Sequence, residues 1–256
     1  MLALLLAATC SLHPPALEVD IGRRSLPWLP PDLARQVTRH ERAFAAGYAA
    51  AGRWPDEFHR LDGNPNVEAA IAAQCERLVH AIRTQRSFEE VVSGLGALAH
   101  LTLDHASPFL TASGSDPHAA AFSSFTKRAL ARIPIVFYGQ EHGLLRSSRG
   151  GIAPFLARKR HVISPLAPLI REDMDRLGGP ANWHLLDDRS TTFGAASLTV
   201  NHAASDFVNL ASWVWRQAGG LVPVIPHESD TFLVWKGEPQ PREVPGPTIR
   251  IRKAGN

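Results

Sequence analysis

The sequence predicts a single, mostly helical globular domain over residues 26–220, and three observations carry that prediction. Apolar residues make up 45% of the 256 residues and charged residues 20%, which is the composition of a soluble globular protein. Apolar side chains recur at intervals of three and four residues, the spacing of one helix face. Strand-like sequence is confined to residues 231–235, inside a proline-rich tail that we predict to be irregular over residues 221–256.

The first helices are predicted on either side of a long turn. A proline-rich lead-in over residues 26–32 precedes a helix predicted over residues 33–50. Glycine, proline and asparagine then mark a turn over residues 52–66. The next helix is predicted over residues 67–84, where the apolar side chains share one face.

Capping residues locate the later helices. Ser87 and Glu90 have the Ser-x-x-Glu spacing of a capping box. A third helix is therefore predicted to begin there and to run through Asp104 until Pro108 ends it. Further helices are predicted over three stretches: residues 115–134, 163–177 and 199–218.

Residues 1–10 resemble a short secretory or lipoprotein leader, because an apolar run ends in small residues directly before Cys10. We therefore expect export, with Cys10 as the candidate lipid anchor; the alternative is an ordinary buried segment. Once Cys10 is removed or lipidated, Cys75 has no partner within the chain, so no disulfide framework is expected. No later stretch reaches the roughly 18 consecutive apolar residues of a membrane-spanning helix.

Charge and histidine content direct attention to metals rather than to polyanions. The net charge is only +3, so attraction to phosphate-rich partners comes from local patches at most. Two basic stretches, residues 158–161 and 250–253, are most simply solvated surfaces. Twelve histidines against two methionines are more informative, because neutral imidazole is the commonest metal ligand.

The strongest candidate for chemistry lies in the third predicted helix. His100 and Asp104 are four residues apart in an almost wholly apolar stretch, which places both on one helix face. A buried imidazole and carboxylate are costly unless they pair with each other or hold a metal. Gly96 and Ser93 on the same face are small, which would let a neighbouring element bring in more ligands. From this pair alone, a His–Asp hydrogen bond within the core is the simpler interpretation.

Two other regions add side chains that bind metals. The turn at residues 54–59 supplies Asp56 and His59 close together, and His118 stands near the start of the next predicted helix. Asp and His ligands gathered from separate elements are typical of a zinc site built for hydrolysis rather than of a structural zinc finger. The predicted metal ligands are Asp56, His59, His100, Asp104 and His118.

These motifs resemble those of the zinc-dependent phospholipase C superfamily, which includes the single-strand-specific nucleases. Gly47 followed by Asp56 and His59 resembles the early Gly, Asp and His of that family. His100 and Asp104, followed by Pro108, resemble its signature helix, and His118 resembles its third ligand region. Residues 201–220 also resemble its late helix, so the likeness covers roughly residues 30 to 220.

The resemblance implies an all-helical, exported protein that cleaves phosphate esters with a cluster of Zn²⁺ ions, its substrate being a phospholipid, a nucleic acid or a small phosphate ester. Carried over to this chain, Asp56, His59, His100 and Asp104 would bind one zinc ion. Asp104 would bridge toward a second ion, and Asp56 would act as a general base.

This sequence departs from the family pattern at the other metal positions. The family's histidine six residues after the bridging aspartate is Leu110 here, and its acidic ligand four residues after the next histidine is Phe122. His118 is then the only clear ligand of a second ion. Trp28 and His13 are the residues nearest to the family's amino-terminal ligands, and neither fits. We therefore expect one to three zinc ions, with one position best supported. The alternative function is a non-catalytic relative that binds a partner.

A second His–Asp pair, His202 and Asp206, repeats the four-residue spacing. We interpret it as a polar packing pair, with a second metal site as the alternative. His142 and His184 lie in loop-like stretches and are interpreted as surface polar residues.

Overall fold

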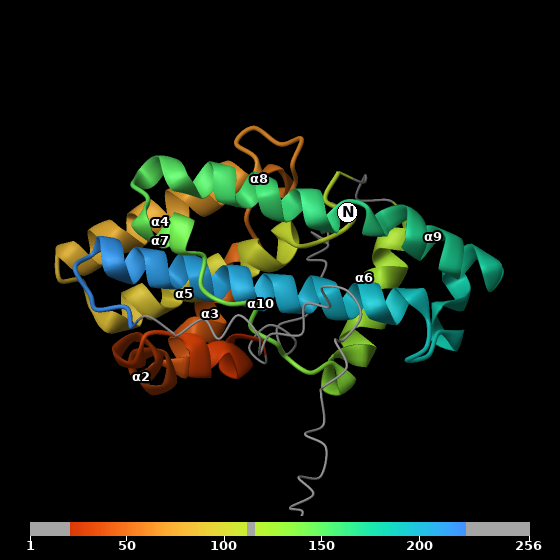
Figure 1. The fold of residues 1–256 in the computed structure, drawn as a ribbon, viewed down its shortest axis with the longest axis horizontal. Helices are drawn as coiled ribbons and strands as arrows, with labels where there is room; N and C mark the ends of the chain where they lie inside the picture. The colour runs from red at the N-terminus through yellow and green to blue at the C-terminus, as the bar shows by residue number, and fades with distance from the viewer. Residues whose placement is uncertain (1–20, 112–115, 224–256) are drawn as a thin grey trace, which may run out of the picture. The chain divides into compact units, whose positions relative to one another are not determined.

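The computed structural model describes residues 21–111 and 116–223, and every regular element in these two ranges is a helix (Figure 1). The predicted all-α fold class is therefore confirmed for the described chain. The predicted leader with Cys10, the residue His13 and the stretches 231–235 and 250–253 lie outside the described residues.

A helical segment over residues 21–25, nine further α-helices longer than one turn and five short 3-10 helices follow one another along the described residues. The α-helices are α2 (Pro31–Arg39), α3 (Glu41–Ala51), α4 (Val67–Arg83), α5 (Phe88–His105), α6 (Pro117–Ala129), α7 (His142–Arg146), α8 (Ile152–Ile163), α9 (Leu166–Arg176) and α10 (Thr191–Gln217). The 3-10 helices are η1 (Leu26–Trp28), η2 (Asp56–His59), η3 (Leu130–Arg132), η4 (Arg149–Gly151) and η5 (Pro180–Leu185).

The capping residues act as the sequence predicts. The Ser87 side chain accepts a hydrogen bond from the Glu90 N–H at the start of α5, and the Asp116 side chain accepts one from the His118 N–H at the start of α6. Each bond satisfies one of the backbone donors that a helix start leaves unpaired. The helix predicted over residues 199–218 is two turns longer at its start, because Ser190 caps it through the Phe193 N–H.

Two helix predictions are wrong in their boundaries. The single helix predicted over residues 33–50 is divided into α2 and α3 at His40, whose backbone angles of φ −113° and ψ 34° are not helical; neither proline nor glycine marks that break. The helix predicted over residues 163–177 corresponds to α9, which begins three residues later, because α8 ends at Ile163 and Ser164 and Pro165 separate the two helices. Proline lacks the N–H that would continue the hydrogen-bond ladder of α8.

Helix α5 is the centre of the packing, in contact with α3, α4 and α10 (Figure 1). The contact with α3 is made backbone to backbone through two glycines. A Cβ added at Gly96 would lie 2.0 Å from the Phe44 carbonyl oxygen, and one at Gly47 would lie 1.8 Å from that of Ser93. Only glycine fits where two helix backbones approach this closely. The neighbouring element expected beside Gly96 is therefore α3.

The apolar core falls into two clusters, and α10 contributes to both of them. One cluster contains Ile71, Leu98 and Phe155, and the other contains Phe125 and Ile170. Because α10 supplies its later half to the first cluster and its earlier half to the second, it fixes the helices around α5 relative to α6 and α9.

Helix α10 also holds the extended segment of residues 134–141 by side-chain hydrogen bonds. Asn201, Ser205 and Asn209 accept from the backbone N–H groups of Val136, Tyr138 and Glu141 at 2.7, 3.0 and 2.8 Å. These three acceptors are buried and four residues apart, so they lie on one face of α10. These bonds pair backbone N–H groups that would otherwise be buried without partners, so the segment does not need to join a β-sheet.

None of the described helices is long and apolar enough to cross a membrane.

Candidate metal site

Three of the predicted ligands converge at one point. His59 ends η2, and His100 and Asp104 lie one turn apart on α5. The Asp104 Oδ2 atom is 2.7 Å from His59 Nδ1 and 3.1 Å from His100 Nε2. In the described part of the chain, these are the three residues whose nitrogen and carboxylate atoms lie within 4.8 Å of one another and could hold a metal ion.

Burial and mutual contact set the charge state of this group. His100 and Asp104 are buried, and the side chain of His59 is only 15% exposed. Burial alone would raise the pKa of Asp104, but the charges and hydrogen bonds of His100 and His59 outweigh it and hold that pKa well below its usual range. Burial opposes charge on His59, yet its hydrogen bond to Asp104 and the charge of Asp104 raise its pKa above 6.5. Asp104 is thus a carboxylate at neutral pH.

The donor set fits zinc. Two imidazoles and one carboxylate are the three protein ligands of many catalytic zinc sites, which keep a fourth position for water or substrate. With bonds of about 2.0–2.1 Å, two ligand atoms of a tetrahedral zinc ion lie about 3.3 Å apart. The separations of 2.7 and 3.1 Å from Asp104 are slightly shorter. A small outward movement of the imidazoles would therefore open the group to the size of the ion.

The outer nitrogens of both imidazoles lack the support that zinc ligands usually have. His100 Nδ1 is buried and makes no hydrogen bond to the described residues. His59 Nε2 makes none of normal geometry, although the Trp54 backbone is close enough to help raise the pKa of His59. Ligating histidines commonly donate from the second nitrogen to a carbonyl or carboxylate, which fixes the ring. Packing fixes the orientation of the His100 ring instead, because the Tyr48 ring from α3 stands edge-on to it at 4.5 Å between centroids.

The structure does not bring Asp56 and His118 into this group. Asp56 is exposed at the first position of η2 and influences His59 through its charge alone. His118 has both ring nitrogens directed at carboxylates, Nε2 at 2.9 Å from Asp175 and Nδ1 at 3.7 Å from Asp116. Helix α6 therefore holds His118 against α9 instead of presenting it to Asp104.

The two departures from the family pattern are core residues. Leu110 and Phe122 are buried, 8% and 4% exposed, among apolar side chains, and the Phe122 ring lies 5.8 Å from that of Phe109. A metal ion beside these positions would meet apolar carbon and not a nitrogen or oxygen ligand.

Two residues of the basic stretch 158–161, which the sequence predicts to be a solvated surface, are partly buried, whereas Arg158 and His161 are exposed as predicted. In the basic stretch 158–161, the Lys159 side chain is only 14% exposed because it forms an ion pair with Glu141. Arg160 binds the Glu68 carboxylate, which also lies 3.4 Å from the buried His105. The interaction of His105 with Glu68 was not predicted from the sequence, although His105 directly follows Asp104 in a helix end that is buried on all sides.

Among solved structures, the chain is similar in fold to a bacterial toxin. The crystal structure of alpha-toxin from Clostridium perfringens, avian strain SWCP, aligns with a TM-score of 0.57 and 11% sequence identity. The alignment covers 81% of this chain and 64% of the toxin chain. At this identity the likeness shows the fold alone. No protein-family model matches the chain, and no curated protein matches it in sequence.

Proposed function

We propose that this chain is a zinc-dependent phosphoric ester hydrolase in which His59, His100 and Asp104 hold one metal ion. The observation that carries the proposal is their convergence from two separate elements, η2 and α5, onto shared points near Asp104 Oδ2. A packing pair would need only His100 and Asp104, which share a helix. The resemblance of the motifs to the zinc-dependent phospholipase C superfamily points to the same three residues.

Zinc bound there would supply a Lewis acid that lowers the pKa of water toward neutrality and polarises a phosphoryl oxygen. The side chains of the protein itself position the ligands and accept the proton. Without metal, Asp104 Oδ2 lies 2.7 Å from His59 Nδ1 and 3.1 Å from His100 Nε2, so one oxygen holds both imidazoles in place. For a cation to bind between these atoms, the protons on the two facing nitrogens would have to leave or move to the outer nitrogens. Asp56 remains the proposed general base: its exposed carboxylate stands one turn before His59 and is open to solvent and substrate.

The substrate class and the location of the protein belong to the same proposal. The motifs imply a phosphodiester, either of a phospholipid or of a nucleic acid, and we propose an exported protein that meets such a substrate outside the cell. With Leu110 and Phe122 in the core, we propose one zinc ion rather than a cluster. A single ion leaves the developing charge on the leaving oxygen less stabilised, so slow turnover is expected.

Zinc content and hydrolysis measured together test the proposal. The parent chain, purified without chelators, should contain about one zinc per chain and should cleave bis(p-nitrophenyl) phosphate. Asp104→Asn should lose the zinc, whereas His118→Asn, a matched loss of a ligand-type side chain outside the group, should retain it. Circular dichroism shows whether both variants are folded.

Each other outcome has a definite meaning. Absence of zinc from the folded parent after incubation with zinc salts would refute the metal site and the enzyme with it. Zinc in the parent without hydrolysis of the model diester, phosphatidylcholine vesicles or single-stranded DNA would favour the binding protein. Two zinc ions in the parent and one in His118→Asn would show that His118 holds a second ion.

A further inference from the structure

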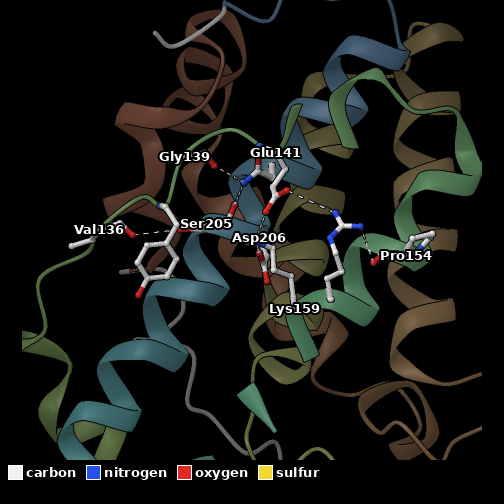
Figure 2. Close-up of polar contacts among 10 residues, drawn as sticks. Val136, Gly139, Glu141, Pro154, Lys159, Ser205 and Asp206 are labelled. Carbon is white, nitrogen blue, oxygen red and sulfur yellow. Dashed lines mark hydrogen bonds and ion pairs between the residues drawn. The ribbon is translucent and has the colours of Figure 1, made fainter. Parts of the chain in front are cut away.

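A second buried group of charges lies between α8, α10 and the segment before α7, and the proposed hydrolase site does not use it (Figure 2). Asp206 lies in the middle of α10 and is only 2% exposed. Lys159 of α8 lies between two carboxylates, 2.5 Å from Glu141 Oε1 and 3.8 Å from Asp206 Oδ1. One ammonium group therefore serves two acids, at unequal distances.

The two carboxylates differ in what else stabilises them. The Glu141 side chain is 32% exposed and also has the Arg158 guanidinium 3.8 Å away. Asp206 Oδ1 is buried and makes no hydrogen bond to any residue that the structure describes. A buried carboxylate without hydrogen bonds is costly in its charged form. Lys159 therefore pairs with the more exposed Glu141, and Asp206 is the acid whose charged form is less well stabilised by its surroundings.

The other titratable groups around Asp206 do not supply a donor. Tyr138 lies on the 134–141 segment, and burial and the charge of Asp206 raise the pKa of its phenol. His202, one turn earlier on α10, is neutral, because burial and the charge of Lys159 lower its pKa to about 4. Its ring is tilted by 58° against the Tyr138 ring, with 4.7 Å between the centroids. Lys159 is thus the one cation within reach of Asp206 in the described region.

We propose that Lys159 is a two-position side chain that binds Glu141 when Asp206 is protonated and moves to Asp206 when Asp206 is ionised. The required movement is short, because a hydrogen bond to Asp206 needs an approach of only about 1 Å from the present separation. Glu141 can be released at low cost, since water and Arg158 remain available to it. Burial, opposed by Lys159, raises the pKa of Asp206 to about 7, so the exchange falls near neutral pH.

The exchange changes which elements α8 is tied to. In the acidic state Lys159 joins α8 to the residue that precedes α7, and in the basic state it joins α8 to the middle of α10. Glu141 keeps its backbone bond to Asn209 in both states. The Lys159 side chain therefore forms a pH-dependent link from α8 either to the residue before α7 or to α10, and this link does not involve the proposed metal site.

Lysine NMR on the full chain tests the switch directly. The sequence contains four lysines, at positions 127, 159, 236 and 253, so a lysine-labelled spectrum is simple, and Lys159→Arg identifies the Lys159 signal. Between pH 5 and 9 the Lys159 side-chain shift should pass through an inflection near pH 7, while the exposed Lys127 signal should not. Asp206→Asn should remove the inflection, and Glu141→Gln should move it down by about one pH unit or more, because Lys159 is then no longer shared.

Two results would overturn the proposal: a Lys159 signal without an inflection between pH 5 and 9 in the folded parent, or an inflection that persists in Asp206→Asn. Should Asp206→Asn fail to fold, Glu141→Gln decides, because an unchanged midpoint in that variant excludes competition for Lys159. Carbon-13 labelling of aspartate in the parent provides a second readout of the Asp206 carboxyl itself.

Discussion

Replacement of Gly96 by alanine should separate α3 from α5 and weaken the candidate metal site at the same time. The new methyl carbon would lie 2.0 Å from the Phe44 carbonyl oxygen and 2.8 Å from the Tyr48 backbone nitrogen. Both neighbours are main-chain atoms of α3, so no side chain can rotate out of the way. The two helices must move apart by roughly 1 Å to restore ordinary contact, and Tyr48 would then move away from the His100 ring.

The magnitude follows from two opposing terms. Glycine to alanine in a helix interior stabilises by about 1 kcal/mol through propensity. Overpacking of a tight contact typically costs about 1–3 kcal/mol, and more where backbone must shift. We therefore expect Gly96→Ala to lower the free energy of unfolding by about 2 kcal/mol.

Two other glycines serve as matched controls for that value. Gly94→Ala, in the same helix, meets only side-chain atoms, with Leu78 Cδ2 at 2.7 Å and Gln74 Nε2 at 3.1 Å, and Gly194→Ala in α10 meets no atom within 4 Å. Urea unfolding should rank the variants with Gly194→Ala above the parent, Gly94→Ala near it and Gly96→Ala well below both. Equal stability of Gly94→Ala and Gly96→Ala would refute the argument from backbone contact. Zinc affinity, where measurable, should fall for Gly96→Ala alone.

Two further predictions concern α10. The folded pKa of Asp206 is raised to about 7 from an ordinary 3.8, so its contribution to stability is complete below pH 3.8 and is lost as the pH rises through 7. At about 1.4 kcal/mol per pH unit the loss of stability is at most roughly 4 kcal/mol. Urea unfolding between pH 4 and 8.5 should show this loss in the parent and not in Asp206→Asn. An identical dependence of stability on pH in both proteins would contradict the prediction. Asn209→Ala leaves the Glu141 N–H and the Gly139 carbonyl without their buried partner. It should therefore lower the free energy of unfolding by about 3 kcal/mol and speed hydrogen exchange at the Glu141 amide. Unchanged exchange there would show that another group accepts the Glu141 hydrogen bond.

The helices and half of the site follow from local rules. Capping by Ser87 and the four-residue spacing of His100 and Asp104 are properties of consecutive residues, and both are seen in the structure. His59 is different, because its convergence with Asp104 depends on the path of a turn of more than ten residues between α3 and α4. No periodicity describes such a path. The prediction of His59 therefore depended on its residue type beside Asp56 in the turn and on the resemblance to a family, and not on a periodic spacing.

The other interactions that the sequence did not predict share a physical cause. Asn201, Ser205 and Asn209 repeat every four residues, but their partners are backbone groups of a segment some 65 residues earlier, which no pattern in α10 reveals. Lys159 stands in a basic stretch typical of a solvated surface, and only the tertiary position of Glu141 and Asp206 makes it a buried cation. Long-range pairing of polar groups is thus the part that local sequence does not encode.

The pH dependence of stability separates a zinc site from a purely hydrogen-bonded His–Asp–His group, because the two have opposite signs. Without metal, the raised pKa of His59 contributes stability that is fully present below pH 6.5 and is lost as the pH rises through the folded pKa. With zinc in excess the ligands must be deprotonated, so stabilisation grows with pH. It reaches about 2.7 kcal/mol when zinc is at a hundredfold its Kd.

Thermal unfolding between pH 5.5 and 8, with EDTA in one series and zinc in the other, should therefore give curves that diverge as the pH rises. His59→Gln should remove the divergence, because it takes away the imidazole on which both effects depend. Parallel curves in the folded parent would mean that zinc does not compete with protons for His59, and the three residues would then be a buried polar cluster that joins η2 to α5.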